Sequence, residues 1–320
     1  MNLQLLTDNL TNPALLFFLL GVIAVQCKSD LEIPPSSAKF ISLYLLLSIG
    51  FKGGQELAHS SFSAEILGSV ALGIATAVCI PFYTFFILRR KFTVYDAGAV
   101  AAAYGSVSAV TFVTAGSFLE AQQLHYSGHM VAVMALMEVP AIIVGVILIR
   151  KFATEKNAIG SMSHVLKHSV TNGSVLLILG SLCIGFMANE QQAEGIRPFT
   201  NDLFKGFLAI FLLDMGLVSG KKMQDFIKNG WFAVAFSIFI PLVNGCVVAC
   251  LSGYFVQDLG NRFVLSVLAA SASYIAVPAA MKMAVPKANP GLFLPMALAI
   301  TFPLNITIGM PLYLYLVRFF

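Results

Sequence analysis

Residues 101–109 read AAAYGSVSA and residues 269–274 read AASASY, and each stretch lies inside a long apolar segment. Small and hydroxyl residues at the middle of such a segment allow two interpretations. In the first, they let neighbouring helices pack closely in the membrane. In the second, both helices break there and cross, since unpaired backbone at that depth is tolerated where protein buries it or where it lines a cavity. The recurrence of the pattern in both halves of the chain favours the second interpretation.

The composition of the chain is that of a membrane protein. Of its 320 residues, 58% are hydrophobic and 11% are charged, and the mean hydropathy is +0.86. A soluble domain could not cover its surface with so few polar groups. Continuously apolar runs, unlike the alternating pattern of a β-barrel, predict an all-α polytopic protein in the lipid bilayer. The ten predicted membrane helices are residues 13–29, 36–58, 63–88, 93–118, 127–149, 173–189, 199–220, 230–256, 260–284 and 290–317.

The two halves of the chain resemble each other at an offset of roughly 160 to 166 residues. An odd number of helices in each half forces the second copy to be inverted, as in many secondary transporters. We therefore expect a first five-helix repeat at residues 1–151, a polar cytoplasmic linker at 152–171 and a second, inverted repeat at 172–320. The matched pairs are Pro34 with Pro198, Pro81 with Pro241, residues 105–109 with 270–274, and residues 138–140 with 301–303.

The basic residues predict the orientation. If loops alternate between the two sides, one side holds all 19 lysines and arginines except Lys52, Arg197, Lys205, Arg262 and Arg318. By the positive-inside rule the richer side is cytoplasmic, so both termini face the periplasm or the cell exterior and the protein lies in a bacterial inner membrane. The net charge of +4 therefore reflects topology. The sequence contains no basic cluster interleaved with aromatic residues, which would indicate nucleic-acid binding.

The two broken segments predict an anion site. Two half-helix N-termini would direct backbone N–H groups and positive dipole ends at the same point, which suits an anion. Serine hydroxyls there can donate to an anion or supply oxygen ligands to a sodium ion.

Ionisable residues within apolar spans are functional candidates by default. Glu138, followed by the helix-interrupting Pro140, is a candidate cation ligand or one half of a structural ion pair. Asp214 is either functional or a partner for Lys221. The sequence IGFKGG at residues 49–54 predicts an unwound hinge or external gate at Lys52, or an ordinary helix end, because paired glycines weaken a helix.

The sequence resembles the sodium-dependent bicarbonate symporter family first described in cyanobacteria. The resemblance covers nearly the whole chain and is carried by residues 47–54, 105–108 through Glu120, 137–141, 269–278 and 288–290. It implies two inverted repeats arranged as a core and a gate domain, an elevator-type movement and commonly a homotrimer. It also implies bicarbonate between the crossing segments of the fourth and ninth helices, with sodium close by.

Carried over residue by residue, the resemblance implies two sets of ligands. The substrate-binding set is Ser106, Val107, Ser108, Ala109, Ser271, Ala272 and Ser273, with Tyr274 beside it, and the sodium set is Ser108, Thr111, Ser273 and Glu138. Tyr274 stands where cyanobacterial members tend to have an aspartate, which opens the possibility of a changed coupling ion or substrate. The linker at 152–171 is shorter than in those members, which weakens the implied control by a cytoplasmic regulatory protein.

The sequence is compatible with three functions. We expect a sodium-coupled importer of bicarbonate or a related small anion. The alternatives are a carrier of another small organic acid or a proton-coupled carrier using Glu138, and a membrane sensor that binds without transport. An enzyme would need a nucleophile with a base, or a metal cluster, at one depth, and the sequence offers neither.

Overall fold

A computed structural model describes residues 12–60, 63–153, 167, 171–226 and 230–320, which form helices and connecting segments without any strand. Most of the predicted linker at residues 152–171 lies outside this described part. Six helical stretches within it are long and apolar enough to cross a membrane: Ala64–Leu88, Val94–Ala121, His129–Phe152, Glu190–Met223, Trp231–Tyr254 and Pro290–Phe319. The chain is a multi-pass membrane protein.

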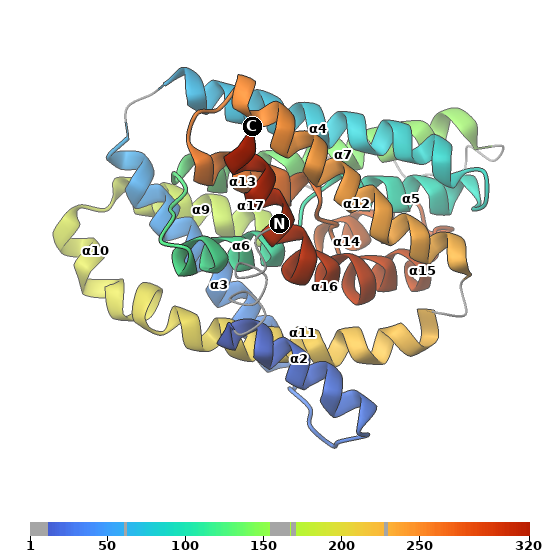
Figure 1. The fold of residues 1–320 in the computed structure, drawn as a ribbon, viewed down its shortest axis with the longest axis horizontal. Coiled ribbons are helices and arrows are strands. Elements are labelled where there is room, and N and C mark those ends of the chain that lie inside the picture. Colours follow the sequence, from blue (N-terminus) through green and yellow to red (C-terminus); the bar gives the residue numbers. More distant parts are fainter. Residues whose placement is uncertain (1–11, 61–62, 154–166, 168–170, 227–229) are drawn as a thin grey trace.

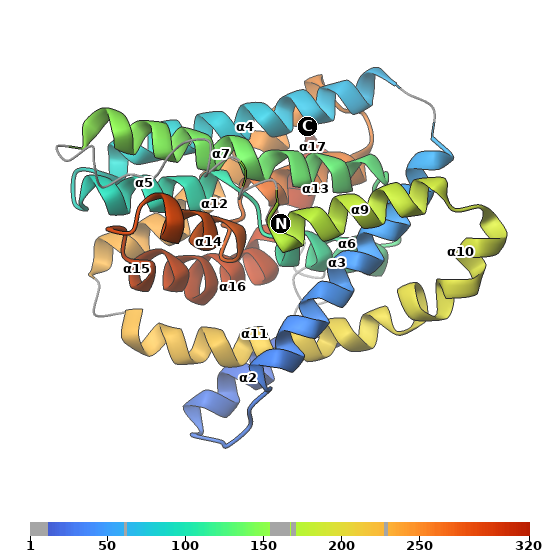
Figure 2. The same cartoon turned by 180° about the vertical axis from the view of Figure 1, so that it is seen from behind.

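The helices divide into two groups by their contacts. The smaller group is α2 (Pro13–Gln26), α3 (Pro35–Ala58), α9 (Gly173–Met187) and α11 (Phe204–Phe226). The larger group is α4 (Ala64–Leu88), α5 (Val94–Gly105), α6 (Ala109–Ala121), α7 (His129–Phe152), α12 (Trp231–Leu251), α13 (Leu259–Ala269), α14 (Ala276–Ala284) and the last span, Pro290–Phe319. Figures 1 and 2 show α2, α3 and α11 on one side of the larger group.

The last span is not a uniform α-helix. Its α-helical pieces α15 (Pro290–Pro295), α16 (Phe302–Leu304) and α17 (Met310–Phe319) are joined by the π-helical turns η5 (Met296–Thr301) and η6 (Asn305–Gly309). π-Helical turns are frequent at functional sites. Within this span, the hydroxyl of Thr301 lies 2.7 Å from that of Tyr104, and Asn305 Nδ2 lies 2.6 Å from the Ala270 carbonyl oxygen.

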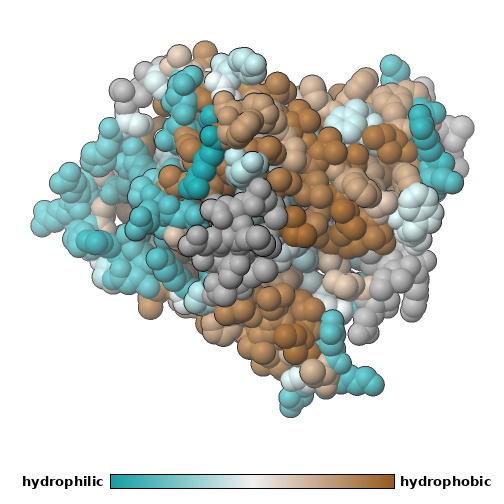
Figure 3. Space-filling model, viewed as in Figure 1, coloured by the Kyte–Doolittle hydropathy of each residue, from teal (hydrophilic) through white to brown (hydrophobic). Residues whose placement is uncertain are grey.

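The seventh predicted helix, residues 199–220, was predicted to begin too late in the sequence. In the structure, α10 (Glu190–Arg197) and a π-helical turn, η2 (Pro198–Asp202), precede α11 almost without interruption. Hydropathy missed α10 because its residues are polar. The signal was a capping box, in which Asn189 and Gln192 satisfy each other's backbone N–H groups. Figure 3 shows hydrophilic residues gathered at the end of the molecule where α10 lies, and hydrophobic residues across the middle of this face.

Glycines bring the helices of the smaller group into close contact. A Cβ atom added at Gly54 would lie 2.1 Å from the Leu182 carbonyl oxygen, and one at Gly216 would lie 2.1 Å from that of Phe18. The prediction of an unwound hinge or helix end at residues 49–54 was therefore wrong. Helix α3 continues through Lys52 to Ala58, because these glycines allow α3 to lie directly against α9 and α7.

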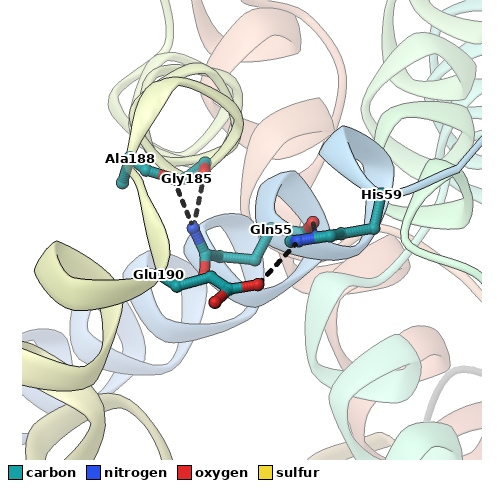
Figure 4. A network of polar contacts seen from close by, with 5 residues as sticks. All are labelled: Gln55, His59, Gly185, Ala188 and Glu190. Carbon is teal, nitrogen blue, oxygen red and sulfur yellow. Dashed lines mark hydrogen bonds and ion pairs between the residues drawn. The ribbon is translucent and has the colours of Figure 1, made fainter.

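A side-chain clamp secures the ends of α3 and α9. Figure 4 shows Gln55 reaching from α3, and its Nε2 donates to the carbonyl oxygens of Gly185 at 2.9 Å and Ala188 at 3.0 Å. These carbonyls at the end of α9 have no partner within the helix. One turn after Gln55, His59 Nε2 lies 3.7 Å from the carboxylate of Glu190, the first residue of α10. The ends of α3 and α9 are thus joined by hydrogen bonds.

Two glycines of α9 give a matched test of this packing. In Gly185→Ala, the new Cβ would lie 2.1 Å from the Phe51 carbonyl oxygen, whereas nothing lies within 4 Å of one at Gly180. Overpacking typically costs about 1–3 kcal/mol, while an unobstructed glycine-to-alanine change in a helix gains about 1 kcal/mol. We expect Gly185→Ala to lower the melting temperature of the detergent-solubilised protein and Gly180→Ala to leave it unchanged or raise it. Equal melting temperatures would contradict the close approach.

Candidate functional site

Two breaks in the helices meet inside the protein. Helix α5 ends at Gly105 and α6 starts at Ala109, while α13 ends at Ala269 and α14 starts at Ala276. The Ser108 backbone N–H donates to Ser271 Oγ at 3.0 Å. In the other direction, the Ser273 backbone N–H donates to the Ala103 carbonyl oxygen at 2.8 Å. The two breaks, although 165 residues apart in sequence, are thus hydrogen-bonded to each other.

Side chains satisfy much of the irregular backbone at the breaks. Ser108 Oγ accepts from the Thr111 N–H at 3.1 Å and caps α6. Ser273 Oγ accepts from the Val277 N–H at 3.3 Å in the first turn of α14. On the other side, Asn305 Nδ2 donates to the Ala270 carbonyl oxygen at 2.6 Å. Non-helical backbone is therefore sustained here because protein surrounds it.

A small cavity lies between these breaks and the smaller group of helices. Its volume is about 20 Å³, room for about one water molecule. The larger group contributes the loop before α6, the start of α6, Glu138 and the start of α14, and the smaller group contributes α3, α9 and α11. The lining residues are Ser42, Leu45, Leu46, Val107, Ser108, Ala109, Val110, Val113, Glu138, Ser174, Phe211, Ser273, Tyr274, Ile275 and Ala276.

The cavity gathers part of the predicted site. Of the residues expected to bind substrate or sodium, those that line it are Val107, Ser108, Ala109, Glu138, Ser273 and Tyr274. Ser106, Thr111, Ser271 and Ala272 are buried next to it without lining it. The Ser271 hydroxyl is engaged instead as a bridge, since it donates to the Leu268 carbonyl oxygen at 2.8 Å and accepts from Ser108.

The electrostatics of the cavity combine positive and negative elements. The first-turn N–H groups of a helix lack intrahelical partners and carry a positive partial charge. The starts of both α6 and α14 border the cavity, through Ala109 and Ala276. Glu138 on α7 also borders the cavity, and the charge of its ionised carboxylate is opposite to that of the helix starts. The arrangement can hold an anion near the helix starts and a cation near the carboxylate.

Glu138 and Tyr274 carry unsatisfied polar atoms at this cavity. Glu138 is 8% exposed and Tyr274 is 9% exposed. Glu138 Oε2 makes no hydrogen bond to any described residue, and the Tyr274 hydroxyl interacts with the Ser108 side chain without the geometry of a full hydrogen bond. A buried charge is costly unless it is paired, and a buried polar group is costly unless it is hydrogen-bonded. A ligand bound beside Glu138 or Tyr274 would supply the missing partner.

The other acidic candidate, Asp214, lies near enough to Tyr274 for their charges to interact. Asp214 in α11 is buried but does not line the cavity. Sequence reasoning missed the wall formed by the smaller group, where Ser42 and Ser174 are hydroxyl residues at apolar positions. Their polarity could have indicated that they line a cavity. Nothing in the sequence indicates this for Leu45, Leu46 and Phe211, because any apolar residue suits a membrane helix.

A sequence model described as the Na+-dependent bicarbonate transporter superfamily matches residues 13–318, almost the whole chain. A search of curated proteins finds no match.

Proposed function

The chain belongs to the Na+-dependent bicarbonate transporter superfamily, and from that premise we propose that it imports bicarbonate or a related small anion together with sodium. Family membership makes it a transporter that acts on a small anion in the bilayer, and not an enzyme. The observation that carries the specific proposal is the cavity where the starts of α6 and α14 meet. Helix starts favour anions, and serine hydroxyls border the same space.

In this proposal the anion binds between Ser108 and Ser273 after the cavity, which has room for about one water molecule in this structure, has widened. Both hydroxyls line the cavity while accepting from a backbone N–H, so each keeps its proton to donate to an anion. Ser106, Val107, Ala109, Ser271, Ala272 and Tyr274 complete the proposed anion site by shaping or supporting the two breaks. Sodium is proposed near Glu138, with oxygen ligands from Ser108, Thr111 and Ser273.

A second candidate function is a carrier of another small organic acid, or one driven by protons. The free Oε2 of Glu138 supports it, because a buried carboxyl group can be neutralised by a proton as well as by a cation. Tyr274, where cyanobacterial relatives tend to have an aspartate, also supports a changed substrate or ion. A sensor without transport has no comparable support.

We propose ten membrane helices in two inverted five-helix repeats. Contacts at equivalent positions support the inversion. Asp96, in the first turn of α5, accepts from the Asn289 N–H at 2.7 Å. Its counterpart Asn261, in the first turn of α13, accepts from the Ser127 N–H at 2.7 Å. Each broken helix is thus tied at its start to the segment that precedes the fifth helix of the opposite half.

The remaining proposals concern movement and surroundings. The cavity lies between the two helix groups, which supports an elevator movement of the larger group against the smaller one. The distribution of basic residues supports an inner-membrane location with both termini outside. The homotrimer and a cytoplasmic regulatory partner at residues 152–171 rest on the family resemblance.

Uptake into liposomes tests the function directly. We expect the reconstituted protein to accumulate radiolabelled bicarbonate when an inward sodium gradient is applied at fixed pH, since the sodium gradient is the proposed driving force. Liposomes with equal sodium on both sides are the control. Accumulation driven only by a proton gradient, or accumulation of a labelled organic carboxylate that unlabelled bicarbonate does not reduce, would replace this proposal with the second candidate.

A further inference from the structure

A second cavity, of about 200 Å³, lies at the Lys52 end of the molecule between α3 and α6. It is lined by Ile49, Lys52, Gly53, Glu56, Val113, Gly116, Ser117, Glu120, Leu124, His125, Tyr126 and Phe204. Val113 borders this cavity and the central cavity alike. The two spaces therefore adjoin at one side chain.

The faces of two helices run from one cavity to the other. On α3, Leu45 lines the central cavity, and Ile49 and Lys52 line the second one. On α6, Val110 lines the central cavity, Val113 lines both, and Glu120 lines the second one. Residues three or four apart share a helix face. The seam between α3 and α6 thus extends from charged residues at the second cavity to the proposed anion site.

Two lysines and two carboxylates gather where this seam opens on the second cavity, and one of the carboxylates, Glu56, lies beside Lys52. Glu120 Oε1 lies 3.9 Å from Lys52 Nζ on α3, and Glu120 Oε2 lies 3.3 Å from Lys205 Nζ on α11. Lys52 and Lys205 belong to the smaller group and Glu120 belongs to the larger group. Both ion pairs therefore join the two groups across the entrance.

Helix α6 connects this entrance to the anion site. Ser108 caps its start at the central cavity, and Glu120 lies in its last turn. A carboxylate at the end of a helix is disfavoured by the helix dipole, whereas a lysine there is favoured. Glu120 thus depends on its two lysines, and α6 cannot move relative to α3 and α11 without changing these ion pairs.

We propose that Lys52, Glu120 and Lys205 form an anion-operated gate on the outer side, in which an incoming monovalent anion replaces the Glu120 carboxylate beside Lys52. This inference rests on the proposed function for the identity of that anion. The side chains of Lys52 and Glu120 are 39% and 40% exposed. Ion pairs at such exposure are weak, so a solvated anion can compete with Glu120. The anion then continues along the seam past Val113.

The gate can be tested without transport. Ser117 lines the second cavity one turn below Glu120, so we expect slow thiol labelling of Ser117→Cys in detergent. The background replaces Cys27, Cys79, Cys183, Cys246 and Cys250, the native cysteines. Adding Glu120→Gln should speed labelling several-fold because both ion pairs are lost. The matched control is Glu194→Gln, an exposed carboxylate on α10 paired with Arg197, which should leave the labelling rate unchanged.

The charge-swapped variant Lys52→Glu, Glu120→Lys and Lys205→Glu separates the gate from the anion contact. It should return labelling toward the slow rate, because both ion pairs are remade, but raise KM for the anion, because the α3 lysine is lost; changes in peripheral charge alter association. Elution as a folded, monodisperse species is required of each variant. The proposed gate would be contradicted if Glu120→Gln were labelled as slowly as the parent. It would also be contradicted if the charge-swapped variant were labelled as fast as Glu120→Gln. Failure of the parent to take up bicarbonate would instead refute the proposed substrate and leave the labelling result standing.

Discussion

Glu138→Gln is expected to reduce sodium-driven accumulation at least about tenfold, which corresponds to about 1.4 kcal/mol or more of lost interaction. Glu138 is 8% exposed and lines the central cavity, and its Oε2 has no hydrogen bond to any described residue. A buried carboxylate in this setting requires a cation or a proton. Glutamine keeps the shape of the side chain but cannot balance the charge of sodium.

The same variant has a readout independent of transport. A ligand that binds only the folded state stabilises it by about 2.7 kcal/mol at one hundred times its dissociation constant. Sodium should therefore raise the melting temperature of the parent protein and not that of Glu138→Gln. The matched control is Asp214→Asn, which alters a buried carboxylate that does not line the cavity. It should retain the sodium response.

Two results would remove Glu138 from the proposed sodium site. One is an unchanged half-saturating sodium concentration in Glu138→Gln. The other is a parent protein that ignores sodium but responds to a proton gradient, with that response lost in Glu138→Gln. The second result would make Glu138 the proton-carrying group of the alternative function.

Ser108→Ala and Ser273→Ala are expected to raise KM for bicarbonate about tenfold to a hundredfold, because a hydrogen bond to a charged group contributes about 1.5–3 kcal/mol. Each hydroxyl lines the cavity and also accepts from a first-turn N–H of α6 or α14. Alanine therefore removes an anion ligand and a helix cap together. Ser108→Thr and Ser273→Thr keep the hydroxyl and should retain more of the affinity.

A serine away from the cavity provides the control for this series. Ser266→Ala in α13 removes a buried hydroxyl that donates to the Arg262 carbonyl oxygen, and it should leave KM unchanged. Initial rates of bicarbonate uptake over a range of concentrations give the comparison. If the alanine variants at Ser108 and Ser273 match the parent in KM, the anion does not bind between the two breaks.

The sequence determined the class of the protein and the positions of its breaks. The hydropathy of a segment depends only on its own residues, and a segment that crosses the bilayer must be apolar along its length. The apolar spans could therefore be predicted from the sequence of each segment. The stretches at 101–109 and 269–274 marked the breaks, because glycine and serine weaken a helix at a depth where apolar residues are otherwise favoured. Hydropathy failed at α10, a polar helix whose signal was its capping box.

The tertiary structure decided which residues of the breaks face the cavity. Helical periodicity assigns faces only along a regular helix, and the backbone at 106–108 and 270–275 is irregular. Ser273 therefore lines the cavity, while Ser271 bridges the two breaks. Packing between distant segments also made the glycines of residues 49–54 a helix contact in place of a hinge. Such contacts depend on which helix lies opposite, and a single segment of sequence does not encode that.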